Sequence, residues 1–69
     1  MDAREIQRVE AYFQRTFRLP EMRVMQRPKK EDSAEVYIGD EFIGVLFRDD
    51  EDGELSYSFQ MAILDFDLE

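Results

Sequence analysis

The spacing of apolar residues changes near Pro20, and this change constrains the fold more than any other feature of the sequence. Asp2 followed by Glu5 approximates a capping box, so we expect a helix to begin there. Pro20 disfavours the helical conformation at the preceding residue, which predicts that the helix ends near Phe17 or Arg18. Between these limits, apolar residues recur at the spacing of one helix face: Ile6, Val9, Phe13 and Phe17.

After Pro20 the apolar residues alternate with polar ones, which is typical of half-buried strands. Gly39-Asp40 predicts a two-residue hairpin turn, because Gly takes the positive φ that such turns require. This turn pairs Val36 with Ile43. Five-residue loops at 28–32 and 49–53 extend the register: the first pairs Val24 with Val36, and the second pairs Phe47 with Leu55 and Ile43 with Phe59. One apolar set then shares the buried face: Met22, Val24, Ala34, Val36, Ile38, Ile43, Val45, Phe47, Leu55, Tyr57 and Phe59.

These patterns predict an α+β fold in a single domain, residues 1–69, with one N-terminal amphipathic helix packed on one face of an antiparallel β-meander. We expect about four strands in the order α-β-β-β-β. Two points stay open. The first strand could pair with the fourth instead of the second, and the alternation changes phase near residue 63, which predicts a bulge, a bend or a short helix in residues 62–69.

Charge and composition exclude several classes of protein. The chain has 17 acidic and 9 basic residues, a net charge of -8, which disfavours binding to nucleic acid or an anionic membrane. The charge is also divided, since residues 1–30 carry eight basic and four acidic groups (+4) and residues 31–69 carry one and thirteen (-12). There is no Cys, no apolar run that could span a bilayer and no signal peptide, so we expect a cytoplasmic protein.

The sequence offers little to catalysis or metal binding. It has no His and no Cys, the residues that most often act as general base and thiol nucleophile, so we expect no enzymatic activity, no catalytic residue and no cofactor. The acidic loop at residues 49–54 could offer oxygen ligands to a divalent cation. An EF-hand alignment with Gly53 at its sixth position places Arg48 first and Phe59 last, where carboxylates are needed, so we expect a solvated hairpin turn and no metal site, with cation binding as the open alternative.

The second face of the predicted sheet is a candidate interaction surface, because Tyr, Phe and Met are favoured at interfaces. We expect a small protein-interaction module that binds an unknown protein partner or a second copy of itself through this surface. In a competing interpretation the residues form a cross-strand pair that Phe66 and Leu68 fold back to cover. The surface consists of Met25, Tyr37, Phe42 and Leu46.

A nucleic-acid accessory role is the alternative function. It would use the basic N-terminal half, above all the hairpin that carries four cations and the basic side of the helix. The adjacent acids and the negative net charge oppose such binding. The four cations are Arg23, Arg27, Lys29 and Lys30.

The middle of the chain, from Ser33 through the Gly39-Asp40 turn to Gly53 and on to Asp65, resembles a family of short alphaproteobacterial proteins, the domain of unknown function 3126. The likeness extends to the helical Arg-Val-Glu-Ala-Tyr of residues 8–12. It implies a bacterial, cytoplasmic, stand-alone protein. The resemblance carries no activity and assigns no role to any residue.

Overall fold

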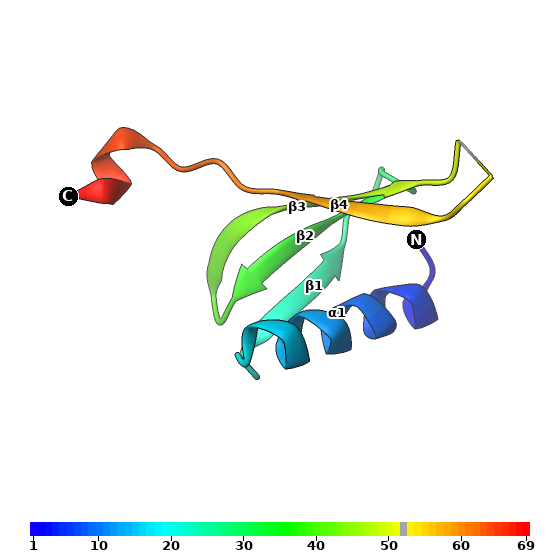
Figure 1. The fold of residues 1–69 in the computed structure, drawn as a ribbon, viewed down its shortest axis with the longest axis horizontal. Coiled ribbons are helices and arrows are strands. Elements are labelled where there is room, and N and C mark those ends of the chain that lie inside the picture. Colours follow the sequence, from blue (N-terminus) through cyan, green and yellow to red (C-terminus); the bar gives the residue numbers. More distant parts are fainter. Residues whose placement is uncertain (52) are drawn as a thin grey trace.

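The computed structural model describes residues 1–51 and 53–69. One helix precedes four antiparallel strands, and a short 3₁₀ helix follows them (Figure 1). The strands form one open sheet in the order β1-β2-β3-β4, which confirms the predicted α+β meander and excludes pairing of the first strand with the fourth. The elements are α1 (Ala3–Phe17), β1 (Met22–Gln26), β2 (Ser33–Ile38), β3 (Glu41–Asp49), β4 (Ser56–Gln60) and η1 (Asp65–Leu68).

Helix α1 begins and ends where the sequence predicts. The Asp2 side chain accepts a hydrogen bond from the Glu5 N–H at 2.8 Å, which satisfies one of the free amides of the first turn. Arg18 follows the last turn in the left-handed conformation, with φ 57°, and its N–H donates to the Gln14 carbonyl. The chain then leaves the helix before Pro20.

Helix α1 lies beside β1, the first edge strand, and hydrogen-bonds to its backbone. The Glu10 Oε2 atom accepts from the Val24 N–H at 2.9 Å, and Gln14 Nε2 donates to the Met22 carbonyl at 3.0 Å. Glu10 and Gln14 are one helical turn apart, so they reach alternate backbone groups of the strand. The helix thereby protects an edge that would otherwise offer unpaired groups to another chain.

The core lies between α1 and the sheet face that α1 covers. Val9 and Phe13 are the buried residues of α1, whereas Phe17, predicted on the same stripe, is 49% exposed at the end of the helix. Ser33 is the buried polar residue of the described chain, and its Oγ accepts from Arg27 Nη1 at 3.3 Å. The buried hydrophobic residues are Met1, Val9, Phe13, Met22, Val24, Ala34, Val36 and Leu46.

A β-bulge in the β2–β3 hairpin corrects the predicted register. The turn forms as predicted, with Gly39 at φ 60° and Tyr37 opposite Phe42. The register then shifts, and Val36 lies opposite Gly44 instead of Ile43. From this point the even-numbered residues of β3 face α1, so the prediction that Val45 and Phe47 share the buried face is wrong: Val45 lies opposite Glu35, Phe47 lies opposite Ser33, and Phe47 is 40% exposed. Ile43, at the bulge, still packs against the core.

The β3–β4 register also differs from the prediction. Leu46 lies opposite Phe59 and Arg48 opposite Tyr57, whereas the five-residue loop predicted Ile43 opposite Phe59. Strand β3 continues to Asp49 and β4 begins only at Ser56. Leu55, predicted to pair with Phe47, lies before β4. The odd-numbered residues of β4 nevertheless face α1 as predicted, because the bulge has moved the even-numbered residues of β3 to that face as well.

The segment that follows β4, residues 61–69 (the C-terminal segment), leads away from the sheet (Figure 1). It contains the 3₁₀ helix η1, the short helix that was one of the predicted alternatives. Phe66 is 68% exposed and Leu68 is 73% exposed, so the prediction that they fold back over the sheet is wrong. No helix among residues 1–51 and 53–69 has the length and the apolar character needed to cross a bilayer.

Candidate binding groove between α1 and β4

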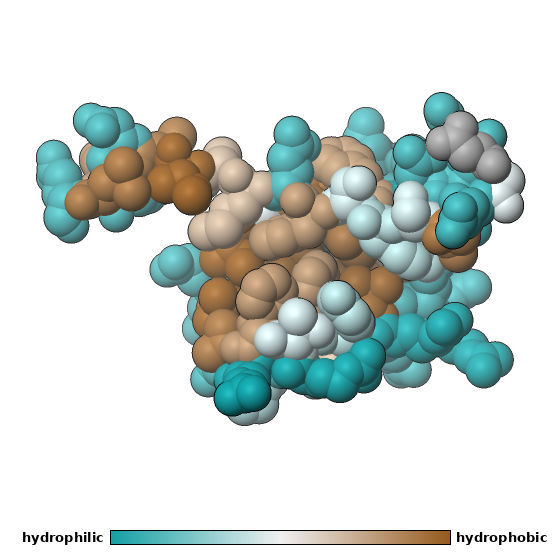
Figure 2. Space-filling view, viewed as in Figure 1, coloured by the Kyte–Doolittle hydropathy of each residue, from teal (hydrophilic) through white to brown (hydrophobic). Residues whose placement is uncertain are grey.

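One helix covers only part of this sheet. An α-helix with its side chains is about 10 Å wide, and neighbouring strands lie about 4.8 Å apart, so a single helix covers about two strands. Because α1 lies beside β1, the uncovered part of its face lies over β3 and β4. Figure 2 shows apolar surface between the helix and the outer strand, bordered by polar side chains on the outer side of α1.

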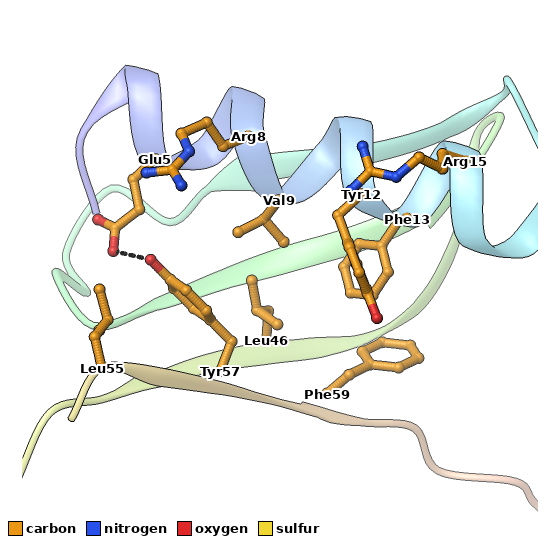
Figure 3. Close-up of a pocket in the computed structure, with 10 residues that line it drawn as sticks. All are labelled: Glu5, Arg8, Val9, Tyr12, Phe13, Arg15, Leu46, Leu55, Tyr57 and Phe59. Carbon is orange, nitrogen blue, oxygen red and sulfur yellow. Dashed lines mark hydrogen bonds between the residues drawn. The ribbon is translucent and has the colours of Figure 1, made fainter. Parts of the chain in front are cut away.

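A groove of about 630 Å³ occupies this uncovered part; we call it the α1–β4 groove (Figure 3). Its floor comes from the sheet and from the inner side of α1, and its rim comes from the exposed side of α1 and from the residues at the start of β4. Helix α1 contributes Glu5, Arg8, Val9, Tyr12, Phe13 and Arg15. The sheet and the loop before β4 contribute Leu46, Leu55, Tyr57 and Phe59.

The floor of the groove is apolar and well packed. The rings of Phe13 and Phe59 meet edge to face with centroids 5.4 Å apart, a favoured arrangement for aromatic pairs. Leu46, directly opposite Phe59 on β3, is only 2% exposed beneath them. Tyr12 and Leu55 stand on opposite rims and are about half exposed (51% and 48%). The groove therefore has a fixed apolar floor between exposed apolar walls.

Two arginines of α1 line the groove. The Arg15 guanidinium carbon lies 5.4 Å from the centre of the Tyr12 ring, within the range of cation–π attraction. Arg8 is one residue before Val9 and also lines the groove. Within the described residues the ion pairs join Arg48 to Glu5 and Arg48 to Asp50, so neither Arg8 nor Arg15 has an acidic partner there. Both can attract an anionic group.

A polar cluster closes the end of the groove near the N-terminus of α1. Glu5 Oε2 accepts hydrogen bonds from the Tyr57 hydroxyl (Figure 3) and from Arg48 Nε at 2.7 Å, which connects α1 to β4 and β3. The hydrogen bond from Tyr57, together with the one from Arg48, lowers the pKa of Glu5 below its ordinary value of 4.5. Burial, and then the bond to Glu5, raise the pKa of Tyr57. The Glu5 carboxylate is thus ionised at neutral pH and already hydrogen-bonded to Arg48 and Tyr57.

This cluster predicts acid sensitivity. The folded-state pKa of Glu5 is depressed, so its stabilisation is present above about pH 4.5 and is lost as pH falls through the lowered value. Glu5→Gln should cost about 1 kcal/mol of unfolding free energy at pH 7 and should make the loss of stability between pH 5 and pH 3 shallower. Urea unfolding of the wild type and the variant at pH 7, pH 5 and pH 3 measures the unfolding free energies. The control Glu54→Gln changes an exposed carboxylate; equal pH dependence for the wild type and Glu5→Gln would contradict the role of the cluster.

The predicted interaction surface is only partly assembled. Met25, Tyr37 and Phe42 lie on the sheet face opposite α1 (the far face); Tyr37 and Phe42 make a T-shaped pair with centroids 5.7 Å apart, and Met25 and Phe42 are exposed. Leu46 is not part of it, because the bulge turns it into the core. The Tyr37 hydroxyl donates to Glu35 at 2.9 Å, and this bond raises the pKa of Tyr37.

The structure distributes the other charged candidates over separate parts of the fold. Arg23 lies on the far face with Met25, whereas Arg27 reaches Ser33 and the two lysines lie between β1 and β2. In the acidic loop the Glu51 N–H donates to Asp49 Oδ1 at 3.0 Å, as in an Asx turn; Asp52, part of the predicted cation loop, lies outside the described residues. Among the described residues no group of three or more potential metal ligands is close enough to hold an ion.

The chain matches a known protein family over most of its length. The family described as "Protein of unknown function (DUF3126)" matches residues 5–67, which include most of α1, all four strands and most of η1. The chain belongs to this family. The comparison with curated proteins found no match, and neither did the comparison with solved structures. The match confirms the predicted family, DUF3126, and the matched residues include every residue that lines the groove.

Reasoning from the sequence missed the groove of this DUF3126 chain, although two signals were present. The first is the helix count, since one helix of 15 residues cannot cover four strands. The second is that residues 42–47 are apolar on both faces of β3, apart from Gly44. Alternation within such a run does not choose a face. The Glu5 cluster had no signal, because it joins residues 43 and 52 positions apart.

Proposed function

We propose that this chain is a small, non-enzymatic protein-interaction module that binds an extended apolar and acidic segment of a protein partner in the α1–β4 groove. One observation carries the proposal: an apolar groove of about 630 Å³ has two arginines on its rim that lack an acidic partner within the described residues. Apolar side chains of a partner would fill the floor, and its acids would approach the arginines.

The groove supports this role better than the far face does. The hollow near Met25 and Tyr37 is about 160 Å³, roughly a quarter of the groove. A larger hollow of about 530 Å³ lies between β3 and the C-terminal segment, where Phe42, Phe47 and Leu64 line it, but its lining includes no basic residue that would attract an acidic partner. On the far face Glu35 lies between Met25 and Val45 in the strand register, which interrupts the apolar surface. Binding sites for peptides and small ligands are concave and mostly apolar, with a few placed polar groups, and the groove has this composition.

The test is a titration of the isotope-labelled chain with a synthetic nonapeptide that alternates Leu or Phe with Asp, followed by amide chemical shifts. We expect shifts at groove residues such as Val9, Tyr12 and Phe59, and much weaker ones with a peptide in which Lys replaces Asp. Two matched variants locate the site, since each places a charge at a half-exposed apolar residue. Leu55→Glu, in the groove, should abolish binding, and Phe42→Glu, on the far face, should leave it unchanged. The opposite result would refute the proposal.

A further inference from the structure

We propose that the natural occupant of the α1–β4 groove is the C-terminal segment of a second copy of this chain, so that two copies exchange these segments. The inference rests on the proposed function, because it names the partner of the same groove. The C-terminal segment is strongly apolar, yet its large apolar side chains are exposed: Met61 (51%), Ile63 (63%), Leu64 (51%), Phe66 (68%) and Leu68 (73%).

The segment has the chemistry that the groove requires. Apolar and acidic residues alternate from Leu64 to Glu69. Binding in the groove requires the single turn of η1 to open into an extended conformation, in which the apolar side chains fall on one side and the acids on the other. Figure 2 shows the apolar side chains of this segment as a patch separated from the groove surface. The apolar side matches the groove floor, which Phe13, Leu46 and Phe59 form, and the acidic side matches the rim.

The dimensions and charges also agree. Residues 63–69 span about 23 Å when extended, close to the length of about 22 Å of the 15-residue helix α1. Arg8 and Arg15 are separated by about 10 Å along α1, and Asp65 and Glu69 by about 13 Å along an extended strand. The segment carries three acids and no basic residue. Glu5, the acid that lines the groove, is already engaged by Arg48 and Tyr57.

A second copy fits better than the chain's own segment. The segment continues the direction of β4 beyond the sheet (Figure 1), so its own groove is accessible only if the chain reverses direction just after β4. Residues 61–64 are Met-Ala-Ile-Leu and lack the Gly, Pro, Asn and Asp that tight turns use. The C-terminal segment can instead bind in the groove of a second copy. Reciprocal exchange about a two-fold axis then fills both grooves and gives a closed dimer.

Charge reversal tests the exchange. Because each copy has a net charge of -8, added salt weakens local attraction and overall repulsion together, so reversal is more informative than ionic strength. By sedimentation velocity, we expect the wild type to dimerise. Arg8→Glu with Arg15→Glu, or Asp65→Lys with Asp67→Lys, should weaken the dimer about tenfold or more. An equimolar mixture of the two double variants should restore a heterodimer. The control Arg23→Glu with Lys29→Glu changes the same charge outside the groove and should leave the dimer intact.

The outcomes separate this inference from the proposed function. A wild type that stays monomeric at millimolar concentration, or a dimer that both reversed variants retain, would overturn segment exchange. If the groove amides still shift with the synthetic acidic peptide in that case, the binding function stands with a different partner. If they do not shift, both proposals fail. Unchanged amide spectra of the sheet core in every variant exclude loss of folding as the cause.

Discussion

Phe13→Ala is expected to remove most of the stability of this protein. Phe13 is 6% exposed and packs on Phe17 and Phe59, with ring centroids 5.8 and 5.4 Å away. Truncating a buried Phe costs about 3–5 kcal/mol, and a domain of 69 residues has a total unfolding free energy of about 3–10 kcal/mol. The variant should therefore be largely or wholly unfolded at 37 °C, as thermal unfolding followed by circular dichroism would show.

The neighbouring Tyr12 provides the matched control. It lies on the same helix but is 51% exposed at the groove rim, so Tyr12→Ala should cost less than about 1 kcal/mol. The same substitution should weaken binding in the groove, because it removes one apolar wall and the ring beneath Arg15. If the two variants lose similar stability, α1 does not pack on the sheet through Phe13, and the groove described above has no floor.

Gly44→Ala is expected to have the second largest effect and to act on β4. A Cβ at this position would lie 2.5 Å from the Gln60 carbonyl oxygen and 2.7 Å from Phe59 Cε1. The first of these atoms belongs to the backbone, so β3 and β4 must separate or shift. We expect a loss of about 1–3 kcal/mol of unfolding free energy. Amide hydrogen exchange should be accelerated most in the β3–β4 ladder, since that is where the strands move apart.

Gly39→Ala separates this packing effect from the general effect of replacing a glycine. Nothing lies within 4 Å of a Cβ at Gly39, but its φ of 60° is unfavourable for Ala, at a cost of about 1–2 kcal/mol. That variant should lower stability without a selective change in the exchange of β4 amides. Selective exchange of β4 in Gly39→Ala, or normal exchange in Gly44→Ala, would contradict the close approach of Phe59 and Gln60 to Gly44.

The sequence predicted the elements and their order well because their signals are local. The Asp2 cap, the helical stripe and the Gly39 turn each act within a few residues, and the structure confirms the helix limits and the antiparallel meander. The β1–β2 register was also correct, with Val24 opposite Val36. There Arg23 separates Met22 from Val24, and Glu35 separates Ala34 from Val36, so a charged residue marks the opposite face on each strand.

The register beyond Tyr37 could not be predicted in the same way. Residues 42–47 are apolar on both faces of β3, apart from Gly44, so a one-residue bulge keeps an apolar residue on each face and costs little in burial. The bulge moved Leu46 from the predicted interaction surface into the core. The β3–β4 register also differs from the prediction, and it pairs even-numbered residues of β3 with odd-numbered residues of β4. The two register errors therefore cancel for β4, and Phe59 lies on the α1 side as predicted.

The candidate site depends on tertiary arrangement, which explains why a different surface emerged from the structure. The sequence singled out exposed aromatic residues of the sheet, and the structure keeps Met25, Tyr37 and Phe42 together on the far face. The larger concave surface arises because α1 lies at the β1 edge and leaves β3 and β4 uncovered. The position of a helix on a sheet depends on contacts between distant residues, such as Glu10 with Val24. Local sequence patterns do not predict such contacts.

The most direct measurement uses an equimolar mixture of isotope-labelled and unlabelled chains and records only contacts between different copies. Segment exchange predicts intermolecular nuclear Overhauser effects from Phe66 and Leu68 of one copy to Tyr12 and Phe59 of the other. It also predicts their loss in Asp65→Lys with Asp67→Lys. Contacts of Phe66 and Leu68 confined to their own chain, or sharp resonances typical of an unbound segment at concentrations where the protein is fully dimeric, would contradict it.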